Sequence, residues 1–596
     1  MQSIYSKIRV GGENTNSVRW SWFRRFGSWK IERDSRFKKV DDKDTARFES
    51  ILDSRNNPSS VLYQKTENLS AYNTDWLRKY KGEAPVVLKP KQTQEVSALL
   101  EYCNANNIAV CVQGGNTGLV GGSVPVFDEV IINLSRMNNI LSFDEQSGIL
   151  QCEAGVILEN ADKYLREKYT FIYPLDLGAK GSCQIGGNIS TNAGGLRLLR
   201  YFVYFFHSLV SSLPPFLVFL SPLWFFFFFF LKSINHKYKR YGNLHGNVMG
   251  LEVVLANGNV LNLQSNNIKD NTGYDLKHLF IGSEGTLGVI TKASVLCMKE
   301  PTSYNLLFLA LPSFANALKV KLLAKRVLNE IISAIEFADF QSLKFPLTYL
   351  HNRCSFPLEG KYTDYPFYML IETSGSNDTH DKEKLTQLIE TLFNEKLISA
   401  GTIAQDMGQF RSIWTLREGI GPGIGESKRA CYKYDVSLPL YQMYDVVENC
   451  RVRVEEMLGH DTIKRGEIDV VGYGHLGDGN LHLNVVTPTF ASKYENVLEP
   501  WIYDQCSYYR GSISAEHGLG RMKGNMIHYN KSALAVNLMK NFKQLLDPKG
   551  ILNPYKLKVS YPKNMLWHCF CLLLLKSNFN EQAVKPSQQK LTAFSR

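Results

Sequence analysis

The sequence of 596 residues lacks the patterns that mark several common classes of protein. Its formal net charge is +12, yet basic residues are interspersed with acidic ones and no dense basic stripe appears, so we expect no nucleic-acid partner. There is no G-x-x-x-x-G-K-[ST] motif, and no G-x-G-x-x-G motif opens a helix after a strand. These absences argue against a P-loop NTPase and against a Rossmann-type nicotinamide site.

Paired cysteines are also missing from the body of the chain. The eleven cysteines show no paired spacing apart from Cys569-x-Cys571 near the C-terminus. Most of the others lie in apolar surroundings, as free thiols of a protein core do. The sequence therefore favours a reducing compartment over a disulfide framework.

Acidic residues are nearly absent from the first thirty positions. Glu13 stands alone against six lysines and arginines, serines and aromatic residues fill the spaces, and there is no apolar core of a secretory signal. This composition predicts a mitochondrial presequence and hence the mitochondrial matrix, with a disordered basic tail as the alternative. We expect residues 1–47 to be presequence and disordered lead-in, and folding to begin near Phe48.

Asp, Glu, Lys and Arg are all missing from Phe202 to Leu231, where Phe225–Phe230 are consecutive phenylalanines. The length permits a transmembrane helix, but three prolines interrupt it, and the block separates LRLLR from YGNLHG within a glycine-rich region. We interpret residues 202–240 as an aberrant insertion from a retained intron or a wrongly drawn gene model, with a membrane anchor as the alternative. The tail 558–596 has the same interpretation, since its apolar run Cys569–Leu575 is too short to span a bilayer.

Among the patterns that the sequence does contain is a predicted short hairpin at Val471–Val486, VGYGHLGDGNLHLNVV. Its glycine-rich centre predicts a tight turn between two strands. His475 stands at the mouth of the turn, and alternation places His482 and Asn484 on one face of the outgoing strand. Two imidazoles brought together in this way suit a divalent metal, and the alternative is a turn with two hydrogen-bonded histidines.

Glycine-rich loops are the second prominent feature. Pro85–Leu88 is predicted to be a strand, Thr93–Asn104 a helix and Ile108–Val112 the next strand, which leads directly into Gln113–Ser123. That loop has five glycines within nine positions, so its backbone can approach a ligand closely and cradle phosphate oxygens.

Three similar tracts follow, and all four alternate with apolar runs that read as strands. They lie at Pro174–Gly195, Tyr241–Glu252 and Asp275–Thr291. Such an arrangement suits one long cofactor lying in an extended groove. Beyond them, Phe314–Asn329 and Lys382–Asn394 read as amphipathic helices and Phe367–Glu372 as a strand.

The four tracts resemble the PCMH-type FAD-binding domain of the vanillyl-alcohol-oxidase-like flavoproteins. With the hairpin, Ser514–Gly520 and Asp547–Pro554, they resemble the D-2-hydroxyglutarate dehydrogenase family, over roughly Arg33–Leu557 apart from the insertion. The resemblance implies an α+β fold: an FAD-binding domain of two α+β subdomains, an α+β cap for the substrate, and a C-terminal helical segment that returns to the FAD domain. The predicted boundaries of these three parts are 48–300, 301–488 and 489–557.

The resemblance also implies which residues contact FAD. Covalent relatives have a histidine after the glycine pair, where this chain has Asn116, so the flavin is expected to be non-covalent. The expected FAD contacts are Gln113, Gly114, Gly115, Asn116, Thr117, Gly118, Gly121, Gly122, Ser123, Pro174, Gly178, Ser182, Gly186, Gly187, Asn188, Thr191, Asn192, Gly194, Gly195, Gly246, Val248, Val289 and Asn553.

A third metal ligand is needed beside His475 and His482, and the resemblance assigns it to Glu516. The ion is expected to be Zn²⁺, with Mn²⁺ as the alternative, and it would polarise the substrate's α-hydroxyl. His517 would take the hydroxyl proton while hydride passes from C2 to flavin N5. A surface acid and a core histidine are the alternative interpretations of Glu516 and His517.

A dicarboxylate substrate needs fixed positive charge. Arg417 and Lys433 match the carboxylate-binding positions of the resembled family, and Asn484 is expected to donate to the substrate. Each of the two cations alone would usually be a solvated surface residue. The chain departs from the family at Gly419–Gly425, where four glycines and a proline predict a broken helix and a threonine contact is missing near Gly421.

The predicted function is oxidation of D-2-hydroxyglutarate to 2-oxoglutarate, with electron-transfer flavoprotein as the implied acceptor. A D-lactate dehydrogenase of the same superfamily is the nearest alternative. If the 202–240 insertion is translated, an inactive product or a membrane-anchored protein are two further alternatives. A homodimer is left open.

Overall fold

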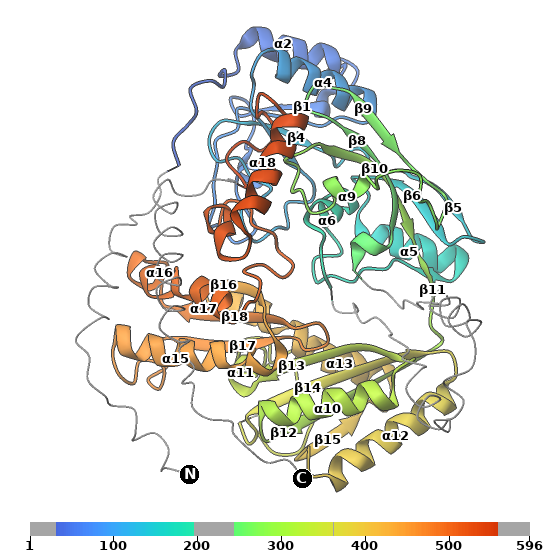
Figure 1. Ribbon diagram of the computed structural model, residues 1–596, viewed down its shortest axis with the longest axis vertical. Helices are drawn as coiled ribbons and strands as arrows, with labels where there is room; N and C mark the ends of the chain where they lie inside the picture. Colours follow the sequence, from blue (N-terminus) through green and yellow to red (C-terminus); the bar gives the residue numbers. More distant parts are fainter. Residues whose placement is uncertain (1–30, 196–242, 362, 558–596) are drawn as a thin grey trace, which may run out of the picture.

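The computed structural model describes residues 31–195, 243–361 and 363–557 (Figure 1). Residues 1–30 of the predicted presequence and lead-in, the 202–240 insertion and the 558–596 tail lie outside these ranges. Within the described residues, no helix combines the length and the apolarity needed to cross a membrane. In Figure 1 the FAD-binding part lies above, the cap lies below, and the red helix α18 (Ala533–Leu546) has returned to the upper part.

Helical structure begins earlier than predicted. Helix α2 (Asp42–Ile51) starts before Phe48, and Asp41 and Asp44 close its N-terminus with a reciprocal capping box. Phe37 and Phe48 are both buried in the core of the FAD-binding part. The predicted start near Phe48 is therefore too late, because the basic composition of the lead-in obscured a capped amphipathic helix.

The first subdomain contains a four-stranded sheet with the order β1-β2-β4-β3. The predicted strand–helix–strand unit is present, with α4 (Thr93–Ala105) connecting β2 to β3, and β4 is inserted between these two strands in parallel register. The sheet carries the first glycine-rich loop at the end of β3. The strands are β1 (Val61–Tyr63), β2 (Val86–Leu88), β3 (Val110–Gln113) and β4 (Val130–Asn133).

The second subdomain is built on an antiparallel five-stranded sheet with the order β5-β6-β10-β8-β9. Helix α6 (Ile185–Thr191), which carries part of the second glycine-rich tract, packs against β10. The strands are β5 (Ile140–Asp144), β6 (Ile149–Glu153), β8 (Val248–Val254), β9 (Val260–Leu263) and β10 (Val289–Leu296), with α5 (Leu158–Tyr169) beside them.

The cap is a seven-stranded antiparallel sheet with the order β15-β12-β14-β13-β17-β18-β16. Strands far apart in the sequence therefore become neighbours, and the pair β17–β18 lies between β13 and β16. The strands are β12 (Ser303–Leu311), β13 (Ile332–Asp339), β14 (Phe367–Gly375), β15 (Ala400–Ile403), β16 (Ala430–Ser437), β17 (Asp469–His475) and β18 (Asn480–Thr487).

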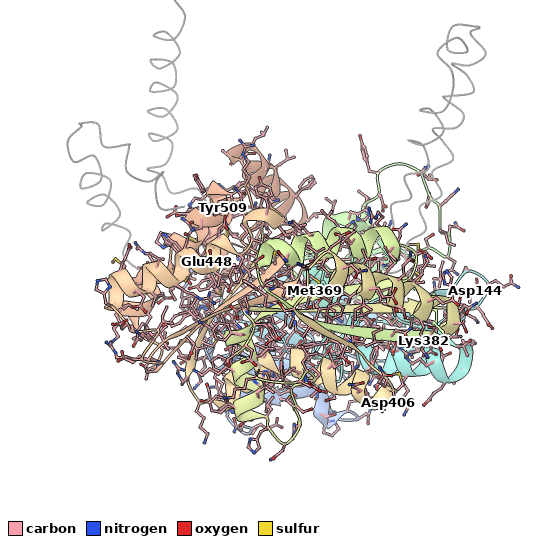
Figure 2. All side chains as sticks on the ribbon, turned by 90° about the horizontal axis from the view of Figure 1, so that it is seen from below. Asp144, Met369, Lys382, Asp406, Glu448 and Tyr509 are labelled. Carbon is pink, nitrogen blue, oxygen red and sulfur yellow. The ribbon has the colours of Figure 1, made fainter. Side chains whose placement is uncertain are left out.

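Helices cover both faces of this sheet, which explains why its central strands are apolar in nearly every position. Alternate residues of β12 enter two different cores, one under each group of helices. Figure 2 shows the cap from below, with Met369 of β14 near the centre of the view. One group is α10 (Phe314–Val327), α12 (Asp378–Asn394) and α15 (Asp445–Leu458), and the other is α11 (Phe340–Tyr349), α13 (Met407–Glu418) and α14 (Ile420–Glu426).

The predicted break is limited to Gly419, and the rest of the glycine-rich segment after Arg417 is helical. Helix α13 ends at Glu418 and α14 begins at Ile420, with Gly419 between them in helical conformation. A side chain at Gly423 would lie 2.8 Å from the backbone of Phe345 in α11. Close packing against α11 thus stabilises a segment whose intrinsic helix propensity is poor.

The C-terminal residues divide between the two parts of the molecule. Helices α16 (Ser492–Leu498) and α17 (Trp501–Tyr508) pack into the cap core. After α18, Ile551 and Leu552 join the core of the FAD-binding part, where the Ile551 carbonyl accepts a hydrogen bond from the Val110 amide. The loop between α17 and α18 therefore crosses from the cap to the FAD-binding part.

Candidate active site

The predicted hairpin is present as β17 and β18, with Tyr473 opposite His482 and His475 opposite Asn480. His475 Nε2 lies 3.3 Å from His482 Nε2, and the two rings are nearly perpendicular. The short turn brings the two imidazoles together as the sequence predicted.

Glu516 lies in the crossing loop after α17 and reaches the same point. Its Oε1 is 3.4 Å from His475 Nε2, so two histidines and one carboxylate offer ligand atoms within 4.8 Å of one another. The Gly195 amide of the second glycine-rich tract lies 3.3 Å from Glu516 Oε1. A side chain at Gly194 would collide with Glu516, so glycine is required for this approach.

The spacing of these atoms fits one small cation. Two ligands held by a tetrahedral zinc at about 2.0–2.1 Å lie roughly 3.3 Å apart, and the two measured separations are 3.3 and 3.4 Å. Two imidazoles with one carboxylate also leave a fourth position open, as catalytic zinc sites do. The residues present therefore fit a divalent metal.

The charges of this cluster are strongly coupled. Burial lowers the pKa of His475, but the carboxylates of Glu336 and Glu516 outweigh burial and raise that pKa to about 9. Burial raises the pKa of Glu516 to about 7. Burial and the charge on His475 hold the pKa of His482 well below its usual value. The two carboxylates thus favour one positive charge at the point where the two imidazoles face each other.

Asp435 of β16 lies on the other side of the cluster and was not predicted from the sequence. Its Oδ2 accepts hydrogen bonds from the backbone amides of Glu516 at 2.8 Å and His517 at 2.9 Å. Its Oδ1 is buried without a hydrogen-bond partner in the described part of the chain and lies 3.8 Å from His482 Nδ1. The register of β16 with β18 places Asp435 directly opposite His482.

His517 follows Glu516 and lies over His482, with nearly parallel rings 6.2 Å apart. Its Nδ1 faces Asp435 Oδ2 at 3.7 Å. Burial lowers the pKa of His517, against the charge of Asp435. The imidazole is therefore neutral near pH 7 and can accept a proton.

The predicted substrate clamp is only partly free. Arg417 Nη2 donates to Glu336 Oε2 at 2.7 Å, and its guanidinium lies 4.8 Å from the ring centre of Tyr473. Arg417 Nε is buried and has no hydrogen-bond partner among the described residues. Asn484 donates to the Tyr473 hydroxyl at 2.9 Å and stands opposite Lys433. Tyr473, which was not predicted from the sequence, contacts Arg417, Asn484 and the ring of His482.

The first two glycine-rich loops touch each other. A side chain at Gly115 would lie 2.0 Å from the Ser182 carbonyl oxygen, whereas side chains at Gly178 and Gly187 would meet nothing within 4 Å in the described structure. Gln184 Oε1 is buried beside Gly114 with no hydrogen-bond partner in the described ranges. Close backbone approach, open space beyond the glycines and an orphaned acceptor together fit a bound cofactor.

Some predicted cofactor residues shape these loops through contacts within the protein. Gln113 donates to the carbonyls of Tyr72 and Ser123, and Asn116 donates to those of Ala71 and Thr74. Val248 and Val289 are fully buried strand residues. The contacts of Gln113 and Asn116 support the loops, and the assignment of these four residues to FAD stays a prediction.

Glu284, in the fourth tract, was also not identified from the sequence. Its carboxylate accepts hydrogen bonds from the amides of Leu519 at 2.8 Å and Gly520 at 2.7 Å, just after His517. Its amide donates to the Ser190 carbonyl, and its own carbonyl accepts from Asn553 Nδ2. Glu284 therefore ties the His517 loop to two elements of the FAD-binding part.

Comparison with known proteins agrees with this geometry. An FAD binding domain model matches residues 84–209, and a model of the C-terminal domain of FAD linked oxidases matches residues 300–557. The mitochondrial D-2-hydroxyglutarate dehydrogenase of Arabidopsis thaliana is 48% identical over 526 residues, which span 88% of this chain and 83% of that protein. The chain belongs to the FAD-linked oxidases of the D-2-hydroxyglutarate dehydrogenase family.

Other members of the family have a different name. A protein of Schizosaccharomyces pombe named as a putative mitochondrial D-lactate dehydrogenase is 46% identical over 535 residues, which span 89% of this chain and 93% of that protein. The structure of p-cresol methylhydroxylase is similar in fold, with a TM-score of 0.63 at 14% identity, covering 87% of this chain and 96% of that one. The predicted α+β fold of the vanillyl-alcohol-oxidase type is therefore confirmed.

Proposed function

We propose that this FAD-dependent hydroxyacid dehydrogenase oxidises D-2-hydroxyglutarate to 2-oxoglutarate. The observation that carries the proposal is the meeting of His475, His482, Glu516 and His517 beside the glycine-rich loops, with Arg417 held nearby. When bound, FAD supplies a hydride acceptor and a divalent cation, Zn²⁺ or Mn²⁺, supplies Lewis acidity.

The chain's own residues prepare the hydroxyl for oxidation. His475, His482 and Glu516 would hold the cation, and the glycine-rich loops would hold the flavin without a covalent bond. His517 receives the hydroxyl proton at Nε2, since its Nδ1 faces Asp435. The two amides bonded to Asp435 keep Glu516 and His517 in fixed positions.

Selectivity for a dicarboxylate is assigned to Arg417 and Lys433. The buried Nε of Arg417 has no hydrogen-bond partner among the residues that the structure describes and can donate to a substrate. A guanidinium can bind a carboxylate through two parallel hydrogen bonds. Asn484 adds a donor on the face of the sheet that carries His482. D-lactate oxidation is the second candidate, because the charge of Arg417 is already shared with Glu336 and one relative is named for D-lactate.

The proposal also covers the compartment, the electron acceptor and the assembly of the protein. The relatives are named as mitochondrial, and we place this protein in the mitochondrial matrix, with a small 2-hydroxy dicarboxylate as substrate. Electron-transfer flavoprotein is the proposed electron acceptor, and a homodimer the proposed assembly, both from the family resemblance.

The test is an absorbance spectrum of the purified full chain, followed by anaerobic addition of D-2-hydroxyglutarate, D-malate or D-lactate. Rapid bleaching of the flavin by D-2-hydroxyglutarate, abolished by a chelator, supports the proposal. Faster bleaching by D-lactate would overturn the substrate assignment, and insensitivity to chelator would remove the metal. A colourless, aggregated chain favours the inactive product, and retention in the pellet after alkaline carbonate favours the membrane-anchored protein.

A further inference from the structure

Glu336 occupies a central position that the proposed reaction does not explain. It lies on β13, is completely buried, and stands directly opposite His475 in the register of β13 with β17. Helix α13 delivers Arg417 to the same carboxylate. One buried acid thus contacts both a proposed metal ligand and a proposed substrate-binding cation.

The hydrogen bonds to His475 orient its imidazole. Nδ1 lies 2.8 Å from Glu336 Oε1 and 2.9 Å from Oε2. When neutral His475 donates its Nδ1–H to this carboxylate, the lone pair resides on Nε2. Nε2 is the atom that faces His482 and Glu516. Glu336 therefore holds His475 in the tautomer and ring orientation that a cation requires.

The same carboxylate fixes Arg417. Glu336 Oε2 accepts from Arg417 Nη2 at 2.7 Å, and Tyr473 lies 4.8 Å from the guanidinium carbon. With one edge held in this way, Nε remains the donor without a partner within the described residues. Glu336 therefore decides which edge of Arg417 is available to a substrate carboxylate.

We infer that Glu336 is a positioning residue that couples the metal site to the selection of dicarboxylate substrates. This inference rests on the proposed function, since it needs both a metal at His475 and a substrate at Arg417. Glu336 acts through these two residues and touches neither the cation nor the substrate. A loss of its charge should therefore weaken metal binding and also reduce the preference for a second carboxylate.

The chemistry of the two donors explains why a carboxylate is needed here. An amide offers one acceptor oxygen and one NH₂ donor. With glutamine at position 336, the NH₂ group replaces either Oε1, which lies 2.8 Å from His475 Nδ1, or Oε2, which lies 2.9 Å from His475 Nδ1 and accepts from Arg417. In both orientations a donor faces His475 Nδ1, and in the second Arg417 also loses its acceptor, which is costly in a buried site.

Glu372 on the neighbouring strand β14 provides a matched control. It is also fully buried, and it accepts hydrogen bonds from Ser333 at 2.6 Å and from Trp414 of α13 at 2.9 Å. Glu372 thus has the same burial, the same sheet and a partner on the same helix, but the two hydrogen bonds that it accepts, from Ser333 and Trp414, involve neither His475 nor Arg417. Comparing the two acids distinguishes a role that couples the metal site to substrate selection from a role in stabilising the cap in general.

The experiment compares Glu336→Gln with Glu372→Gln in the full chain. The first measurement is Zn²⁺ affinity of the metal-stripped proteins, by competition with a chromophoric chelator and without turnover. The second is the ratio of kcat/KM for D-2-hydroxyglutarate to that for D-lactate. We expect Glu336→Gln to bind Zn²⁺ roughly 10- to 100-fold more weakly and to lower the ratio by about tenfold, with Glu372→Gln unchanged in both.

Two results would overturn the inference without affecting the proposed function. In the first, Glu336→Gln has the same Zn²⁺ affinity and the same substrate ratio as Glu372→Gln. In the second, Glu336→Gln binds Zn²⁺ more weakly but has an unchanged substrate ratio. If the wild-type chain binds no Zn²⁺, the proposed function fails at its metal and the inference falls with it, which the wild-type measurement identifies. Should Glu336→Gln fail to fold, Glu336→Asp replaces it. Its shorter carboxylate should shift both properties in the same direction, and wild-type values would contradict the coupling.

Discussion

Replacement of Asp435 by asparagine tests the geometry of the active site at one atom. Both backbone amides that bond to Asp435, those of Glu516 and His517, donate to Oδ2, while Oδ1 faces His482 Nδ1 at 3.8 Å. An asparagine whose oxygen replaces Oδ2 keeps both amide bonds. Its NH₂ group then replaces Oδ1, so the acceptor opposite His482 becomes a donor.

The magnitude follows from this exchange. When His482 binds a cation through Nε2, its Nδ1 carries the proton and needs an acceptor. A buried donor facing another donor costs about 1–3 kcal/mol, and about 1.4 kcal/mol corresponds to a tenfold change in affinity. Asp435→Asn should therefore weaken metal binding by roughly 10- to 100-fold, while the fold and the position of the Glu516 loop are retained.

The assay is competition for Zn²⁺ between a chromophoric chelator and the metal-stripped chain. Asp469→Asn is the control, since Asp469 is a buried acid at the start of β17 that pairs with Arg429 and Lys344, away from both histidines. An Asp435→Asn protein with the metal affinity of the control would refute the reasoning. Circular dichroism of both variants shows whether the fold is intact.

Three other substitutions test, in turn, the cofactor loops, the proton acceptor and the core of the cap. Gly115→Ala places a methyl group about 2.0 Å from the Ser182 carbonyl oxygen, so the amount of bound flavin, measured by absorbance, should fall sharply. The control is Gly425→Ala, whose methyl group would meet nothing within 4 Å in the described structure and which should keep its flavin. His517→Asn should slow flavin bleaching roughly 10²- to 10⁴-fold with unchanged Zn²⁺ affinity. A wild-type rate would contradict the role of His517 as proton acceptor. Burial in α10 lowers the pKa of Lys321 from 10.5 to about 8, so folding expels its proton between these values and stability rises with pH across that window. Lys321→Met should therefore stabilise the chain by about 2–3 kcal/mol below pH 8 and raise the melting temperature more at pH 7 than at pH 10, and equal gains at both would contradict this.

The cluster of two histidines and Glu516, with its supporting acids, depends on the order of strands in the cap. His475 and His482 are neighbours through a short turn, so their approach follows from local sequence. Glu336 is 139 residues from His475 along the chain and becomes its partner only because β13 pairs with β17. Asp435 meets His482 in the same way, because β16 pairs with β18.

The sequence by itself determined the features that depend on neighbouring residues: the hairpin, the two histidines, the glycine-rich loops and the cofactor that such loops imply. It also carried enough family pattern to indicate Glu516, His517, Arg417 and Lys433. It misjudged the segment after Arg417, where close packing against α11 overrides poor helix propensity.

Only the tertiary structure decided which buried acids support the site. Glu336 and Asp435 lie within strands and Glu284 in a loop. In the sequence they resemble ordinary polar residues, because no local pattern specifies which strands pair or in which register. Their roles arise when strands and loops far apart in the chain bring carboxylates to imidazoles and backbone amides. Burial then makes each of those contacts strong, since an unpaired charge or donor in the interior is costly.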